Sequence, residues 1–328
     1  MENAMRLFLI LFMLVCCNAV AGTCKTLPFA PDPAKQLRVM ISTDASNEAD
    51  DAFAVVHALL TPTFKIRGLI AAQYNRTAEM MKNPKPTMAE SYALLTHLLG
   101  IMGSETPVYR GAVNALSDKP QPVSEGAKAI IHEALREDSR PLFILVLGPA
   151  TDIAQALDAQ PEIASRLTVV WIGGNPYPAG GWEYNMFNDP RAASLLFASK
   201  APLWQVPHNV YMSMRVSLAE LAARVKPQGE TGGWLWKQLI DFNQWASARL
   251  KGIPWPKSEV WIMGDNPAVG LLLDDHEYAY EERPAPALND DLSYKTVQGT
   301  RTIRVYQHID SRFILEDFFA KLRLACGE

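Results

Sequence analysis

Residues 39–60, VMISTDASNEADDAFAVVHALL, constrain the fold more than any other stretch of the chain. Their apolar start at residues 39–41 predicts a short buried strand. Residues 52–60, apolar almost throughout and free of glycine and proline, predict a helix. In α/β proteins a strand-to-helix turn lies at the carboxyl edge of the sheet, where such folds bind ligands. This turn therefore predicts a binding site.

Four acidic residues crowd the turn: Asp44, Glu48, Asp50 and Asp51. Carboxylates placed so closely repel one another, and they resist burial unless a cation or a polar ligand compensates them. A helix N-terminus, whose dipole favours negative charge, explains Asp50 and Asp51. It does not explain Asp44, which ends the preceding strand. We therefore favour a functional interpretation over a purely structural one.

Residues 1–21 predict a secretory signal. The basic Arg6 precedes the apolar run 7–17, and the Ala-Val-Ala sequence at 19–21 fits a small-x-small cleavage site. The run is short for a bilayer span, so a retained anchor or a lipid-modified Cys17 is the weaker alternative. We expect a secreted or periplasmic protein with no membrane contact after cleavage. Its oligomeric state stays open, a homo-oligomer included.

Two cysteines remain after signal removal, Cys24 and Cys326, near the two ends of the mature chain. An oxidising compartment permits a disulfide, and the termini of a domain often lie close together. We hypothesise a disulfide between them, with two unpaired cysteines as the alternative. They are too few and too far apart to indicate a structural zinc site.

The remaining chain, residues 22–328, predicts a single α/β domain with a mostly parallel open sheet and helices on both faces. Strand-like and helix-like segments alternate along it, and no change of composition marks a linker. A net charge of −4 argues against a nucleic-acid-binding surface. After the opening unit, we expect strands at 65–72, 141–147, 167–172, 202–206 and 302–305, and a short strand or turn at 107–112. We expect helices at 87–99, 124–137, 151–157, 189–199 and 311–324.

Residues 227–262 differ from the rest because they are rich in tryptophan within a largely helical segment. Gly232 and Gly233 near its start could act as a hinge. An aromatic helix packed on the core and a wall or lid that stacks on a planar ligand are equally good interpretations. The tryptophans are Trp234, Trp236, Trp245, Trp255 and Trp261.

Polar groups follow several other predicted strands. Asn75 follows the second strand, and the Leu147-Gly148 turn follows another, where a backbone carbonyl could face a cation. The sequence WEYNMFNDP at 182–190 and GDNP at 264–267 lie at further junctions. Such junctions converge at one edge of a parallel sheet. Their carboxylate, amide and carbonyl oxygens suit Ca²⁺ rather than zinc.

With these motifs, the chain resembles the nucleoside hydrolase family, the calcium-dependent N-ribohydrolases, over about residues 37–322. The family's D-x-D-P-G-x-D-D-A motif corresponds to TDASNEADDA at 43–52, which is two residues longer and lacks Pro-Gly. A hydrolase-like bacterial branch with a D-x-x-N-E-x-D-D pattern shares this departure. Together with the predicted signal, the resemblance is to a divergent, secreted member of that branch. The family's G-P-L-T-N, M-G-G and E-F-N-x-x-x-D-P-x-A-A motifs correspond to GPATD at 148–152, IGG at 172–174 and EYNMFNDPRAA at 183–193.

The resemblance implies calcium-dependent hydrolysis of the N-glycosidic bond of ribonucleosides or related N-ribosides, giving ribose and free base. It implies that Asp44 is the general base and also a Ca²⁺ ligand. The other implied Ca²⁺ ligands are Asp51, the backbone carbonyl of Leu147, and Asp265. The implied ribose ligands are Asp50, Asn75, Glu183 and Asn185. Asn47 has no counterpart in the shorter motif, and its position suggests a supporting ligand or hydrogen-bond partner.

One implied residue is missing. Many family members place a histidine immediately before the last metal-binding Asp, where it protonates the departing base, but this chain has Gly264. His208 follows a predicted strand near a site edge, although a solvated or core histidine is the simpler interpretation. A Tyr, Trp or water of residues 227–262, or a better leaving group, could compensate. A non-catalytic nucleoside- or sugar-binding protein and a hydrolase of a different glycoside remain alternatives.

Overall fold

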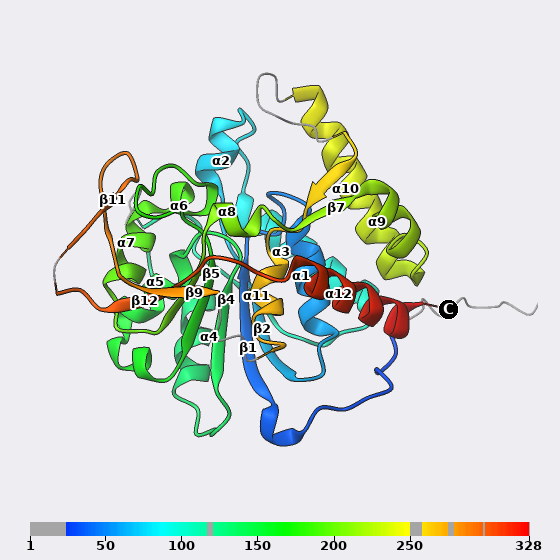
Figure 1. The fold of residues 1–328 in the computed structure, drawn as a ribbon, viewed down its shortest axis with the longest axis horizontal. Coiled ribbons are helices and arrows are strands. Elements are labelled where there is room, and N and C mark those ends of the chain that lie inside the picture. The colour runs from blue at the N-terminus through cyan, green and yellow to red at the C-terminus, as the bar shows by residue number, and fades with distance from the viewer. Residues whose placement is uncertain (1–23, 117–120, 250–257, 275–278, 298, 328) are drawn as a thin grey trace, which may run out of the picture.

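The apolar runs of the sequence form one central sheet in the computed structural model, which describes residues 24–116, 121–249, 258–274, 279–297 and 299–327 (Figure 1). Within these residues the strand order is β3-β2-β1-β4-β5-β6-β12-β9, and only β9 runs antiparallel to its neighbour. The predicted mostly parallel sheet is confirmed. The bounds are β1 (Leu37–Thr43), β2 (Phe64–Ala71), β3 (Val108–Arg110), β4 (Leu142–Val146), β5 (Thr168–Ile172), β6 (Leu203–Val206), β9 (Tyr280–Pro284) and β12 (Thr302–Tyr306).

Helices cover both faces of the sheet, as predicted (Figure 1). Because side chains alternate along a strand, Val39 and Ile41 of β1 enter the core on one face and Met40 enters the core on the other. The first face carries α1 (Asp50–Leu59), α3 (Thr87–Met102), α11 (Asn266–Gly270) and α12 (Ser311–Cys326), and the second carries α4 (Glu125–Ala134), α5 (Thr151–Ala159) and α7 (Pro190–Ala198).

The strand order reverses next to β1. The chain passes from β1 to β2 and β3 on one side, and it then returns to pair β4 against the other side of β1. The backbone N–H of Leu147 donates to the carbonyl oxygen of Ser42 at 2.8 Å, which keeps the ends of β4 and β1 side by side. Such a reversal point is where open α/β sheets bind ligands. The topology therefore places the acidic turn at the expected position.

Short elements complete the described part of the chain: η1 (Pro33–Lys35), α2 (Asn75–Met80), η2 (Pro161–Ser165), α6 (Tyr184–Asn188), α8 (His208–Tyr211), β7 (Arg215–Ser217), α9 (Leu218–Arg224), β8 (Val260–Ile262), β10 (Ala287–Leu288) and β11 (Tyr294–Lys295). None of the described helices is long and apolar enough to cross a membrane. The predicted signal at 1–21 lies outside the described residues.

The tryptophan-rich segment forms the long helix α10 (Gly229–Arg249). Gly232 and Gly233, which could act as a hinge, lie near the start of α10, and the hinge stays a prediction. A side chain at Gly232 would collide with the backbone carbonyl of Val225. Trp234 and Trp236 pack against the first core, as the structural interpretation predicts. Residues 250–257, which include Trp255, lie outside the described residues.

The two ends of the described chain are joined by a disulfide between Cys24 and Cys326, which confirms that hypothesis. The backbone N–H of Lys25 also donates to the carbonyl oxygen of Ala325 at 2.7 Å. Both contacts hold the N-terminal segment against the end of α12.

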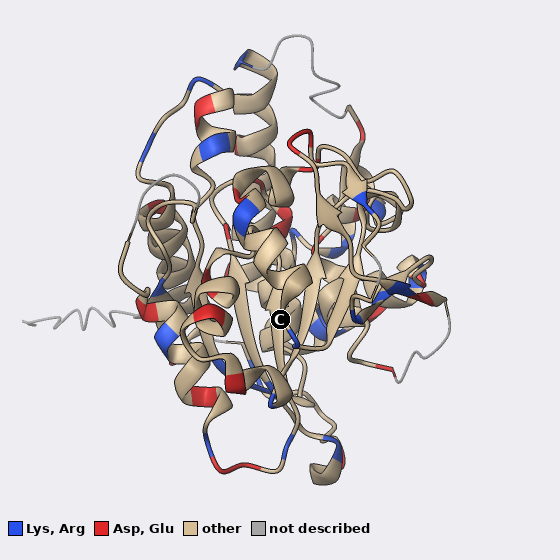
Figure 2. Cartoon of the chain, turned by 90° about the vertical axis from the view of Figure 1, so that its left-hand side faces the viewer, with Lys and Arg blue, Asp and Glu red and all other residues tan. Residues whose placement is uncertain are grey.

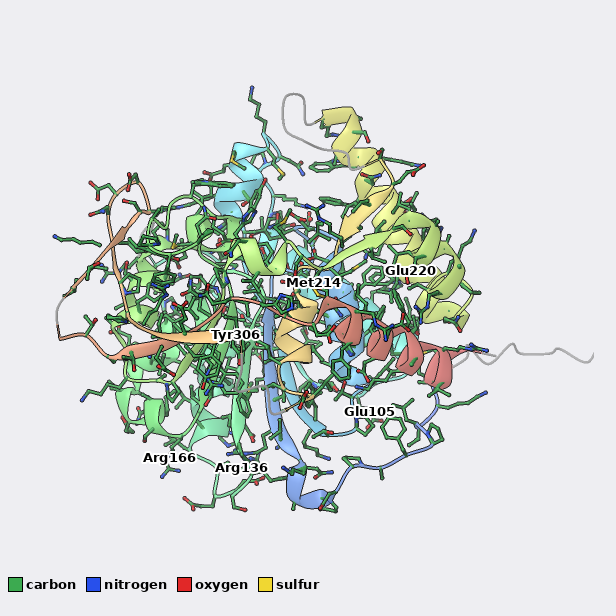
Figure 3. All side chains as sticks on the ribbon, viewed as in Figure 1. Glu105, Arg136, Arg166, Met214, Glu220 and Tyr306 are labelled. Carbon is green, nitrogen blue, oxygen red and sulfur yellow. A yellow bond between two sulfur atoms is a disulfide. The ribbon has the colours of Figure 1, made fainter. Side chains whose placement is uncertain are left out.

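Charged residues of both signs are spread along the chain (Figure 2). Arg38, near the beginning of β1, is a charged residue that is buried. Its guanidinium pairs with the carboxylate of Glu133 at 3.1 Å. Arg67 and Arg136 also contact Glu133, at 3.2 Å and 2.9 Å. Figure 3 labels Arg136 and Arg166 at the lower end of the view, where β4 and β5 begin. The ion pairs of Glu133 thus lie at the amino ends of the parallel strands, and the acidic turn lies at their carboxyl ends.

Candidate active site

A cavity of about 310 Å³ opens where β1, β4 and β5 end. Eight of the nine residues predicted for the site line it, although they come from four separate parts of the sequence. They are Asp44, Asn47, Asp50, Asp51, Leu147, Glu183, Asn185 and Asp265. The structure thus brings the strand-end groups together at one edge of the sheet, as expected for parallel strands.

Three buried carboxylates form a tight cluster in this cavity. Oxygen atoms of Asp50 and Asp51, which begin α1, and of Asp265, which precedes α11, all lie within 4.8 Å of one another. Burial raises the pKa of Asp51 to about 6. Burial, and then repulsion from Asp51 and Asp50, raises the pKa of Asp265 well above its usual range. A cation would relieve both costs, so the cluster could hold a metal ion. Asp50, predicted as a ribose ligand, belongs to this cluster.

Asp44 directly follows β1, and Asn47, in the longer form of the turn, holds it in place. The Nδ2 group of Asn47 donates to Oδ2 of Asp44 at 2.9 Å, and the Asn47 backbone N–H donates to the Asp44 carbonyl at 2.7 Å. Any Cβ at position 148 would collide with the Asp44 carboxylate, so glycine is required there. Asn47 is therefore the hydrogen-bond partner that its position suggested. The base and metal roles of Asp44 stay predictions.

Glu183 organises the loop that carries the EYN motif. Its Oε2 accepts from the backbone N–H groups of Gly174 and Met186 at 2.8 Å and 3.0 Å. Its Oε1 accepts from the backbone N–H of Asn185 at 3.1 Å and from the hydroxyl of Tyr211 at 3.0 Å. These four hydrogen bonds hold the start of α6 next to the end of β5. The ribose role of Glu183 stays a prediction.

Asn185 bridges two strand ends. Its Nδ2 group donates to the carbonyl oxygens of Leu147 and Ile172, both at 2.8 Å. Because both N–H bonds of the amide are used, its carbonyl oxygen Oδ1 is the group that can accept a hydrogen bond from a ligand. The structure therefore couples Asn185 to Leu147, whose carbonyl was predicted to face the cation.

Asn75 is not among the residues that line the cavity. It begins α2, and its Nδ2 group donates to the carbonyl oxygen of Val113 at 2.8 Å. Its Oδ1 accepts from the hydroxyl of Thr87 at 2.5 Å. In this structure Asn75 ties α2 to the start of α3 and to the loop after β3, and its ribose contact stays a prediction.

The cavity is also lined by largely apolar residues that were not among the nine predicted site residues: Ile172, Tyr184, His208, Tyr211, Met212, Trp261 and Ile262. His208 and Tyr211 form α8, which directly follows β6. The sequence places His208 after a strand near a site edge but favours a solvated or core histidine there, and it does not single out Tyr211. Trp261 is buried and lines the cavity, as the wall interpretation of residues 227–262 predicts.

A buried polar network supports the Asp265 turn from behind. Nδ2 of Asn266 lies 3.1 Å from Nδ1 of His57, and Nε2 of His57 lies 2.8 Å from Oδ2 of Asp317. Burial lowers the pKa of His57, which favours the neutral imidazole. A neutral ring that accepts from Asn266 at Nδ1 donates to Asp317 at Nε2. Helices α1 and α12 thereby position the residue next to Asp265.

A model of the inosine-uridine preferring nucleoside hydrolase family matches residues 39–312. The chain belongs to this family. It is therefore a glycosidase of the class that acts on N-ribosides. It is 27% identical over 232 residues to a pyrimidine-specific ribonucleoside hydrolase, RihA, of Salmonella paratyphi A, covering 63% of this chain and 71% of RihA. The RihA of Salmonella typhimurium is 26% identical over the same coverage.

Solved structures of two nucleoside hydrolases share the fold. A plant nucleoside hydrolase, PpNRh1, matches with a TM-score of 0.71 at 17% identity, covering 87% of this chain and 98% of that one. A purine-preferring ribonucleoside hydrolase from Gardnerella vaginalis matches with a TM-score of 0.62 at 20% identity, covering 87% and 98%. These structures agree with the fold class predicted from the sequence.

Proposed function

We propose that the chain is a calcium-dependent hydrolase of ribonucleosides or related N-ribosides that releases ribose and the free base. One observation carries the proposal: a cluster of buried carboxylates and a set of aromatic side chains, the aromatic wall, line the same cavity. The carboxylates suit a cation and a sugar with developing positive charge. The aromatic wall suits a planar base.

The chemistry of the donor set fits calcium. Asp50, Asp51 and Asp265 offer only carboxylate oxygens, and Leu147, whose carbonyl was predicted as a further oxygen ligand, lines the same cavity. Ca²⁺ binds six to eight such oxygens, whereas zinc favours nitrogen and sulfur. When bound, the ion would supply positive charge and lower the pKa of a water molecule in the cavity.

The chain's own residues would then divide the work of hydrolysis. Asp44, oriented by Asn47, would take a proton from the water that attacks the sugar carbon. Asn185, through Oδ1, and Asp50 would hold the ribose hydroxyls and so orient the reacting carbon. The surrounding carboxylates would stabilise the oxocarbenium-like transition state.

We also propose that the protein acts in the periplasm or outside the cell. The predicted signal at 1–21 supports this location, and so does the disulfide between Cys24 and Cys326, since disulfides persist in oxidising compartments. Expression of the full chain in a bacterial host, followed by mass spectrometry of the periplasmic fraction, tests it. A mature protein starting at Gly22 is expected, and an uncleaved cytoplasmic protein would contradict the proposal.

A nucleoside panel assayed with and without a calcium chelator tests the activity. We expect ribose release that stops on chelation and returns with added calcium. Undiminished turnover in chelator would contradict the calcium dependence. Tight nucleoside binding without ribose release would favour the alternative of a binding protein. Turnover of another glycoside, with no turnover of nucleosides, would favour the alternative of a hydrolase of a different glycoside.

A further inference from the structure

Breaking an N-glycosidic bond leaves an electron pair on the nitrogen of the departing base. An ordinary purine or pyrimidine leaves slowly as an anion, so a proton donor beside that nitrogen speeds the reaction by about 10²–10⁴-fold. The carboxylate cluster occupies the sugar side of the cavity. Outside that cluster, the cavity is also lined by His208, Tyr184 and Tyr211, whose side chains carry transferable protons.

Tyr211 is already engaged with the sugar side. Its hydroxyl donates to Oε1 of Glu183 at 3.0 Å, and burial raises its pKa well above the usual range. Its ring covers Gly264, because a Cβ built there would lie 3.2 Å from Cδ2 of Tyr211 and 3.3 Å from Oδ2 of Asp50. Tyr211 thus fills the space beside the acidic cluster, and the ring of His208 packs against it.

The backbone holds His208 firmly at the end of β6. Its N–H donates to the carbonyl oxygen of Gly174 at 2.9 Å, and the N–H of Gly174 in turn donates to Glu183. The imidazole is half-buried and packs edge-on against the Tyr211 ring, with ring centroids 5.2 Å apart and an interplanar angle of 84°. The same loop therefore positions Glu183 and His208 in one cavity.

We propose that His208 is the catalytic acid that protonates the leaving base, an assignment that rests on the proposed hydrolase function. Water oxygen bonds to the anomeric carbon and gives one proton to the Asp44 carboxylate. The carbon–nitrogen bond breaks, its electron pair stays on the base nitrogen, and the His208 imidazolium gives that nitrogen a proton. Proton exchange with solvent then restores Asp44 and His208, so the net reaction consumes one water.

The test compares two leaving groups in the full-length mature protein with calcium. A nucleoside needs protonation of its base, whereas 4-nitrophenyl β-D-ribofuranoside releases a nitrophenolate that leaves without a proton. We expect His208→Gln to lower kcat for nucleosides by about 10²-fold or more while keeping kcat for the nitrophenyl riboside within about threefold. His308→Gln, at an exposed histidine outside the cavity, is the matched control and should change neither rate.

A second variant guards against a folding defect. His208→Ala opens space in the wall, and added imidazole should restore part of its nucleoside activity if a proton donor is what the variant lacks. An equal loss on both substrates, or no loss on nucleosides, would overturn the assignment. A wild-type protein that cleaves only the nitrophenyl riboside would overturn it too. A wild-type protein that cleaves neither substrate would instead overturn the proposed function and this assignment with it.

Discussion

Neutralising one carboxylate of the cluster should stabilise the protein without metal while weakening its metal binding. Asp51 accepts a hydrogen bond from the hydroxyl of Thr43 and lies with Asp50 and Asp265 in the buried cluster. Asp51→Asn keeps an oxygen for Thr43 and removes the charge. The variant thus isolates what ionising Asp51 costs the fold.

The size of the effect follows from the pKa of Asp51, which burial raises from 3.8 to about 6. A pKa raised on folding means that stability from the neutral carboxyl is present below pH 3.8 and is lost as pH rises through 6. At about 1.4 kcal/mol per pKa unit, the ionised carboxylate costs the wild type about 3 kcal/mol at pH 7. The variant, which has no carboxylate at position 51, avoids this cost.

Thermal melts in chelator at pH 7 measure the difference. A chain of about 300 residues unfolds with an entropy of about 0.6 kcal/mol/K, so 3 kcal/mol corresponds to a rise of about 5 °C in Tm. Calcium at 100 times Kd should stabilise the wild type by about 2.7 kcal/mol and the variant far less. Asp290→Asn, on an exposed turn, is the control. The reasoning would be refuted if the Tm of Asp51→Asn in chelator were equal to or below that of the wild type. It would also be refuted if calcium raised the Tm of both proteins equally.

Three further changes probe other contacts. Asn47→Ala removes the hydrogen bond to Asp44, so kcat/KM should fall about tenfold in steady-state assays while Tm changes little; an unchanged rate would contradict the orienting role. Cys24→Ser with Cys326→Ser opens a loop of 302 residues and should lower the free energy of unfolding by about 3–5 kcal/mol in urea titrations. Burial raises the pKa of Asp152 to about 6. The free energy of unfolding of Asp152→Asn should therefore match that of the wild type near pH 4 and exceed it by up to about 3 kcal/mol at pH 7. A difference that stays constant between pH 4 and pH 7 would contradict this prediction.

Local patterns were enough to predict the frame of the molecule. Long apolar runs such as residues 141–147 need no distant partner to favour a strand, and their alternation with helices predicts parallel pairing. The structure has β4 at Leu142–Val146 and a mostly parallel sheet. The short helices α6 and α8 escaped prediction, because four or five residues carry too little periodicity to indicate a helix.

The candidate site was predicted unevenly for the same reason. Residues that directly follow long strands, such as Asp44 and Leu147, were found because parallel strands end at a common edge. Asn75 also follows a strand, yet it bonds to Val113 and Thr87 and does not line the cavity. The direction of a side chain after a strand depends on the elements around it, which one sequence does not show.

The sequence by itself determined that the strand end at Asp44 and the helix start at Asp50 and Asp51 place carboxylates at one turn, because those positions follow from local periodicity. Only the tertiary structure decided which groups complete the turn. It brought Asp265 to the cluster, set Tyr211 over Gly264, and placed His208 in the same cavity. These contacts join residues up to about two hundred positions apart, and only the folded sheet sets such distances.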